Sequence, residues 1–209
     1  MRKAMLFSAL ILISTLAITW SLASNVHLKR KPAVAFQDNT VTSPIATGPL
    51  TLTTSGALTG LGNGDVSVTL SAVAKPTATC TNPGTGEHRP PGRNPALVVL
   101  GGTTGIPGSE IKNGNVAFSV TTIPPPTTVA GAPECPNAAW REDITDLVFL
   151  NATITVGQPA ELDSDGNVIN PGPTVFSTGC SLSGTDGPLS ATCGGSTAAP
   201  AGGVGAISQ

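Results

Sequence analysis

The stretch DVSVTLSAVA, residues 65–74, decides the fold class because its side chains alternate between polar and apolar from Asp65 to Ala72. In an extended chain, successive side chains point to opposite faces, so alternation gives one apolar and one polar face. The apolar face consists of Val66, Val68, Leu70, Ala72 and Ala74, and the polar face of Ser67, Thr69 and Ser71. The stretch predicts a β-strand that buries one side. At Pro76 we expect an edge position or a bulge, because proline donates no hydrogen bond to a ladder.

Further strands are expected along the chain. They are residues 50–53, 96–100, 115–122, 144–156 and 174–178. In residues 144–156, the apolar face is expected to hold Val148, Leu150, Ala152, Ile154 and Val156, opposite Asn151, Thr153 and Thr155. The segment ELDSDGNVI, residues 161–169, predicts a hairpin turn, since Asp-Gly between alternating segments favours one.

The composition agrees with strands joined by many turns. The chain has 25 Gly and 19 Pro, and only 11% of its residues are charged. No segment of useful length shows a helical period, and no βαβ rhythm is present. We therefore predict an all-β fold, an antiparallel β-sandwich of roughly immunoglobulin-like size with disulfide-stapled loops. A small barrel is the alternative.

The expected organisation starts with a signal peptide at residues 1–23, where two basic residues precede an apolar run. Residues 24–47 are expected to be a linker or flexible arm, residues 48–193 the sandwich domain, and residues 194–209 a flexible tail. An uncleaved anchor is the alternative for the apolar run, whose length is about that of a membrane-spanning helix. Both alternatives predict a secreted or otherwise extracytoplasmic protein, and only the second involves a membrane.

The four cysteines all lie in the exported part, which predicts two disulfides in an oxidising compartment. Four cysteines allow three pairings. We favour Cys80 with Cys135 and Cys180 with Cys193, because the Gly-rich segment between the latter two suits a hairpin. A zinc site is disfavoured, since no close Cys-x-x-Cys pair is present.

The charge excludes one class of partner. Without Arg2 and Lys3, the 10 basic residues fall to 8 against 12 acidic residues, a net charge of −4. Nucleic-acid binding needs clustered Lys and Arg to neutralise phosphates, so we expect no nucleic-acid partner. The expected partner is an extracellular or envelope component of unknown identity.

The loop CTNPGTGEHRPPGRNP, residues 80–95, combines glycines with an acid–base pair but predicts no catalytic site. Three prolines deny the helix that a phosphate-binding loop requires. Glu87 and His88 are neighbours without any nucleophile motif, so a solvated loop is the preferred interpretation. We therefore name no catalytic residue and no cofactor-binding residue.

Two acidic clusters leave a calcium site open as an alternative. Calcium takes six to eight oxygen ligands, and both clusters at one end of the sandwich would supply several. The candidate ligands are Glu142, Asp143, Asp146, Asp163 and Asp165. The EF-hand pattern around Asp163 is incomplete, so a plain turn is preferred to a calcium site. An extracellular hydrolase using a carboxylate pair from these acids is the least favoured interpretation.

Several segments together resemble a group of uncharacterised secreted bacterial β proteins. They are GLGNGDVSVTL (60–70), ATCTNPG (78–84), PGRNP (91–95), EIKNGNVAFSVTT (110–122), CPNAAW (135–140) and ITDLVFLNATITV (144–156). They cover about half the chain, and the loop after Gly84 is longer than the resemblance implies. The resemblance implies an exported β protein and assigns no chemistry. The expected function is a non-catalytic structural or binding module, with a calcium-dependent module as the alternative.

Overall fold

The computed structural model describes residues 26–29, 33–40, 49–82, 84–85, 88–89, 96–125, 135, 139–159, 161–162, 164–165, 168–170 and 172–194. The expected signal peptide lies outside these residues. So does most of the expected tail, of which Gly194 alone is described.

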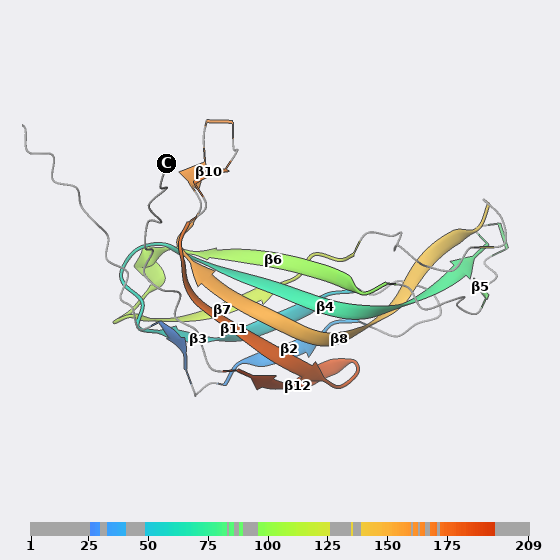
Figure 1. Cartoon of the computed structure of the whole chain (residues 1–209), viewed down its shortest axis with the longest axis horizontal. Coiled ribbons are helices and arrows are strands. Elements are labelled where there is room, and N and C mark those ends of the chain that lie inside the picture. Colours follow the sequence, from blue (N-terminus) through green and yellow to red (C-terminus); the bar gives the residue numbers. More distant parts are fainter. Residues whose placement is uncertain are drawn as a thin grey trace, which may run out of the picture.

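Strands make up almost all of the regular structure in the described residues (Figure 1). They are β1 (His27–Leu28), β2 (Ala35–Asp38), β3 (Leu52–Thr59), β4 (Val66–Thr81), β5 (His88–Arg89), β6 (Val98–Ile106), β7 (Asn115–Thr121), β8 (Arg141–Gly157), β9 (Glu161–Leu162), β10 (Val168–Asn170), β11 (Thr174–Ser183) and β12 (Gly187–Cys193). One 3₁₀ turn, Gly108–Glu110, joins β6 to β7. The prediction of an all-β protein is confirmed.

The strands form one curled antiparallel sheet, with the short β9–β10 hairpin apart from it. Its main path runs β6-β4-β8-β11-β12-β2-β3-β7, and β1 and β5 extend the edges of β3 and β4. β12 joins the two halves, because it pairs with β11 on one side and with β2 on the other. At the far ends of the path, the Ile123 amide donates to the Gly101 carbonyl at 2.8 Å, so the segment after β7 meets β6.

The curl encloses a single core to which both halves contribute. β4 supplies the apolar face predicted from its alternation, and Val66, Val68 and Leu70 are fully buried. The opposite half contributes Phe36 from β2 and Leu58 from β3 to the same cluster. Burial of apolar surface on this scale is the main stabilising contribution to such a fold.

Residues 35–38 were expected to belong to the linker or arm, and they instead form β2 in the middle of the path. β2 lies between β3 and β12, and Phe36 is only 2% exposed. Its four residues are too few to show a period, so the pattern gave no strand signal. Burial of one large ring therefore fixes this strand within the sheet.

β4 passes through Pro76 without a break, and the sheet accommodates the proline as expected. The β4–β8 register shifts on either side of Pro76, between Val73 and Ala74 and between Thr77 and Ala78. β6 pairs with β4 only as far as Ala74, so among the described strands Pro76 pairs with β8 alone. Proline is found in strands at such bulged positions, beyond the end of a neighbouring ladder.

One of these bulges reverses the predicted orientation of Leu150. The sequence pattern placed Leu150 on the buried face, but it is 39% exposed, while Phe149 is buried. Asn151 pairs with Val73 and Phe149 with Ala74, so Leu150 is the extra residue of the bulge. An inserted residue inverts the alternation on one side of itself, which the sequence period does not reveal.

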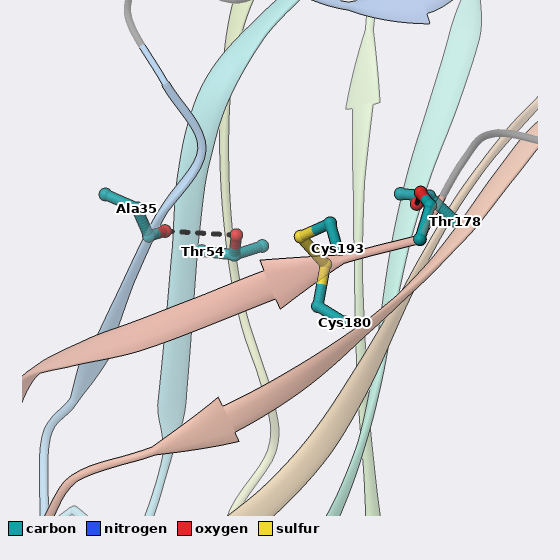
Figure 2. The surroundings of a disulfide bond; sticks show 6 residues. Ala35, Thr54, Thr178, Cys180 and Cys193 are labelled. Atoms are coloured by element: carbon teal, nitrogen blue, oxygen red, sulfur yellow. Dashed lines mark hydrogen bonds between the residues drawn. A yellow bond between two sulfur atoms is a disulfide. The ribbon is translucent and has the colours of Figure 1, made fainter.

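Two disulfides close the structure, and their pairing is the one that the spacing favoured. Cys80 is bonded to Cys135, and Cys180 to Cys193 across the β11–β12 hairpin (Figure 2). The chain-entropy estimate gives roughly 3 to 4 kcal/mol of stabilisation for each. Two disulfides indicate an oxidising, extracytoplasmic environment. Within the described residues, no helix has the length and apolar character needed to cross a membrane.

Candidate functional site

The structure does not bring the predicted calcium ligands together. Glu142, Asp143 and Asp146 lie near the beginning of β8, beside the end of β4. Asp165 lies in the turn between β9 and β10, beyond the other end of β8. Figure 1 shows β10 and β5 at opposite ends of the molecule, and β5 pairs with the β4 residues that lie beside Glu142. Asp163 lies outside the described residues.

The length of β8 explains this separation. Asp146 and Gly157 are eleven residues apart in an extended strand, which corresponds to roughly 37 Å. Among the residues that the structure describes, no group of three or more His, Cys, Asp or Glu side chains is placed to hold a metal ion. The described geometry therefore gives the calcium alternative no support.

A different acidic group lies where β2 meets β12. Asp38 is only 2% exposed, and its Oδ1 accepts a hydrogen bond of 2.8 Å from the Thr40 amide. Burial raises the pKa of Asp38, and the negative charges of Asp186 and Asp146 raise it further. Burial also raises the pKa of Asp146, with a smaller contribution from Asp186. This group is a pH-sensitive part of the fold.

The outer surface of β6, β4, β8 and β11 is the most regular feature of the molecule. The ladders align its residues in rows that cross all four strands, and all of these residues are exposed or half-buried except Gly157, which is buried. The rows are Gly105–Ser67–Gly157–Thr174, Thr103–Thr69–Thr155–Ser177, Gly101–Ser71–Thr153–Gly179 and Val99–Val73–Asn151–Ser181. We call this surface the hydroxyl face. None of its residues is charged or aromatic.

Hydrogen bonds connect hydroxyl groups along the second row. Thr69 Oγ1 lies 3.0 Å from Thr103 Oγ1, and Thr155 Oγ1 lies 3.5 Å from Ser177 Oγ. Strands stand about 4.8 Å apart, and alternate residues on one strand about 6.8 Å apart. The face therefore presents hydroxyl groups at repeating intervals. Each hydroxyl has one donor and two acceptor sites, so a bonded pair keeps capacity for a ligand.

Three shallow hollows open on this face. The first, of about 480 Å³, is lined by residues of the first two rows and by Gly172. The second, of about 610 Å³, shares Thr69 and Thr103 with the first and extends to Ile123 and Pro125. The third, of about 500 Å³, lies over β8 and β11 and includes Gly179. No charged side chain lines any of the three.

Three glycines line these hollows at positions where neither close packing nor backbone conformation requires glycine. Gly105 and Gly179 have no atom within 4 Å of the place where a Cβ would lie, and at Gly101 the nearest is the Leu70 carbonyl oxygen at 3.9 Å. None of the three has a positive φ. Glycine weakens a strand because it loses more backbone entropy on folding than other residues. Stability thus gives no reason for glycine here.

Gly102 and Gly56 show the contrasting case. A Cβ on Gly102 would overlap the Thr121 carbonyl where β6 meets the end of β7. A Cβ on Gly56 would lie 3.0 Å from the ring of Phe118, its partner across the β3–β7 ladder. Close packing explains these two glycines, and also Gly157, where a Cβ would lie 2.9 Å from the Pro173 carbonyl oxygen. Gly101, Gly105 and Gly179 are left as the unexplained set.

The sequence pattern predicted parts of this face but not the face itself. The alternation predicted polar sides for Ser67, Thr69 and Ser71 and for Thr153 and Thr155. It did not show that these segments are neighbours, which depends on tertiary pairing. The expected strand at residues 96–100 also ended before Gly101, Thr103 and Gly105, since glycine and threonine give no apolar alternation.

Comparisons with protein-family models, with curated proteins and with solved structures gave no match.

Proposed function

We propose that the protein is a secreted, non-catalytic β-sandwich module that binds a neutral polysaccharide through its hydroxyl face. The sandwich assignment is supported by the curl, which sets the β6-β4-β8-β11 half over the β12-β2-β3-β7 half around one core. Secretion is supported by the apolar amino-terminal run and the two disulfides. The resemblance to secreted bacterial β proteins supports the same location.

The chemistry of the hydroxyl face suits an uncharged polyhydroxylated ligand. Thr and Ser hydroxyls both donate and accept, as sugar hydroxyls do, so the two surfaces satisfy each other in several orientations. A polyanion or polycation would find no opposite charge on this face. A protein partner would gain little binding energy from this face. Aromatic anchors usually supply most of the binding energy at protein–protein interfaces, and none of the residues of the hydroxyl face is aromatic.

Binding through hydroxyl groups alone is weak at each contact. A net hydrogen bond contributes about 0.5 to 1.5 kcal/mol, and the face has no aromatic ring on which a sugar would stack. A polymer compensates for this, because repeating units engage successive rows and effective concentration raises the overall affinity. We therefore expect retention by polymeric material and weak binding of short oligosaccharides.

The outward glycines are the observation that carries the proposal. Threonine and serine on a solvent-facing strand need no functional explanation, since β-branched residues suit strands anyway. Gly105 and Gly179 run against strand stability, have open space where a Cβ would lie, and sit in two of the hollows. A ligand that approaches the backbone closely is the ordinary reason for such glycines in a strand.

The test is retention of the exported chain on insoluble cellulose, chitin and starch, with matched serine variants. Ser71→Lys places a charge in the middle of the hydroxyl face, and Ser119→Lys places one on exposed β7 in the opposite half. We expect at least one polymer to retain the wild type and Ser119→Lys but not Ser71→Lys, with all three equally stable. Retention of none, or equal retention of both variants, contradicts the proposal.

A further inference from the structure

We propose that the Cys180–Cys193 disulfide is an exchange site, opened by an extracytoplasmic dithiol while the Cys80–Cys135 disulfide stays closed. The inference does not depend on the ligand of the hydroxyl face. It rests on how differently the fold surrounds the two disulfides.

The first difference is access. Cys193 is exposed at the end of β12, and both Cys180 and Cys193 line the third hollow, of about 500 Å³. Cys80 and Cys180 are equally buried, at 4% and 3% exposed, so the difference lies in their partners: Cys193 is exposed, whereas Cys135 is half-buried. Thiol–disulfide exchange needs a thiolate to reach one sulfur, so the disulfide with the fully exposed cysteine, Cys193, reacts first.

The second difference is the spacing of the backbone. Cys180 and Cys193 are directly opposed on adjacent antiparallel strands, and their Cα atoms are 3.9 Å apart. This is shorter than the range of about 4.4 to 6.8 Å in which disulfides are usually found. The Cα atoms of Cys80 and Cys135 are 5.5 Å apart, within that range. Reduction of Cys180–Cys193 therefore relieves a close approach between two strands.

Backbone pairing and further hydrogen bonds hold the β11–β12 hairpin together once this disulfide is reduced. The β11–β12 ladder continues from Ser181–Thr192 to Ser183–Ser190. Beyond Cys193, the Gly194 amide donates to the Gly179 carbonyl at 2.8 Å, and Thr178 Oγ1 donates to the Gly194 carbonyl at 2.9 Å. Figure 2 shows Thr178 beside the disulfide, near the end of β12. Of the β12 residues, Leu189 alone is buried, so opening exposes little core.

The reaction is a balanced two-electron exchange. One thiolate of the dithiol attacks the Cys193 sulfur, the Cys180–Cys193 bond breaks, and Cys180 leaves as a thiolate that takes up a proton. The second thiol of the dithiol, as a thiolate, then attacks the dithiol sulfur that is bonded to Cys193. This closes the disulfide of the dithiol and releases Cys193, which takes up a proton. The dithiol ends as a disulfide and has passed two electrons and two protons to the protein.

The experiment is timed reduction of the native exported protein with dithiothreitol, followed by alkylation and peptide mass spectrometry. We expect Cys180 and Cys193 to acquire the label at least about tenfold faster than Cys80 and Cys135, while circular dichroism keeps its strand spectrum. Equal labelling rates, earlier labelling of Cys80 and Cys135, or labelling that accompanies unfolding overturns the proposal.

Two controls separate the effect of the fold from that of the cysteines. In denaturant, both disulfides lose their surroundings, so the native difference in rate should largely vanish; its persistence would contradict the inference. The variant carrying Cys180→Ala and Cys193→Ala should fold and show slow labelling of the remaining pair. Fast labelling of Cys80 and Cys135 in this folded variant would also count against it.

Discussion

Thr69 Oγ1 lies 3.0 Å from Thr103 Oγ1 across the exposed side of the β4–β6 ladder. The two residues are directly opposed, so the hydrogen bond between their hydroxyls favours one rotamer of each side chain. A ligand that meets this pair does not have to order the side chains first, which reduces the entropic cost of binding. The pair is thus a preorganised part of the hydroxyl face.

Replacing both threonines by valine should separate binding from stability. Valine keeps the branched shape and strand preference but removes both hydroxyls. For Thr69→Val with Thr103→Val, we expect the free energy of unfolding to change by less than about 1 kcal/mol, because an exposed hydrogen bond contributes little. Retention on the polysaccharide that holds the wild type should fall severalfold. Unfolding in urea and a pull-down assay measure the two quantities, and unchanged retention would count against the role of the pair.

Filling the outward glycines should abolish binding without harming the fold. For Gly105→Thr and Gly179→Thr, we expect stability to stay the same or to rise by up to about 1 kcal/mol, since glycine is costly in a strand and each side chain enters open space. Polysaccharide retention should fall, because the hollows become shallower. Gly102→Ala is the control, and should destabilise the protein by overlap with the Thr121 carbonyl.

Strand alternation allowed much of the fold to be predicted, but the pairing of strands did not follow from it. Residues 66–74 and the Cys180–Cys193 pair were anticipated because both depend on local spacing, and Cys80–Cys135, 55 residues apart, followed as the remaining pair. β2 was missed because Phe36 is a single apolar residue in a four-residue strand. The orientation of Leu150 was wrong because a bulge in one strand is set by its partner.

The candidate site was harder to predict than the fold. The acids Glu142, Asp143, Asp146 and Asp165 are close in sequence terms, but a long extended strand carries them to opposite ends. The hydroxyl face draws its rows from four strands that are distant in sequence. The alternation of polar and apolar residues can be recognised in each strand separately. The rows of the hydroxyl face form only when the ladders set the register between the strands.

β2 should be essential to the closure of the curled sheet. Phe36→Ala removes a ring that is 2% exposed in the strand that lies between β12 and β3. We expect a loss of about 3 to 5 kcal/mol in the free energy of unfolding, measured in urea, because the side chain leaves a cavity. Gln37→Ala changes an exposed residue of the same strand and should cost less than about 1 kcal/mol. Similar losses for both variants would contradict this role of Phe36.

The buried aspartate gives stability a definite dependence on pH. The pKa of Asp38 is raised above its ordinary value of 3.8 in the folded state, so the folded protein holds the proton of Asp38 more tightly than the unfolded chain does. The charge of Asp38 lowers the free energy of unfolding. This destabilisation is absent below about pH 3.8, grows as the pH rises through the raised pKa and is complete above it. Asp146 contributes in the same direction.

Asp38→Asn should remove most of this dependence. The amide oxygen of asparagine still accepts from the Thr40 amide, but it carries no charge to bury. We expect the variant to melt at a higher temperature than the wild type at neutral pH, with a difference that shrinks as the pH is lowered through the raised pKa and vanishes below about pH 3.8. Asp165→Asn, at an exposed turn position, serves as the control and should track the wild type. A lower melting temperature for Asp38→Asn at neutral pH would contradict the account.

The most direct test of the hydroxyl face is a nuclear magnetic resonance titration of the labelled, exported chain with neutral cello-, chito- and malto-oligosaccharides of increasing length. We predict that at least one series shifts amide signals of β4, β6, β8 and β11, centred on the Thr103–Thr69–Thr155–Ser177 row, with larger shifts for longer chains. Absence of shifts with every series, or shifts confined to β2, β3 and β7, would contradict the assignment of this face as the binding surface.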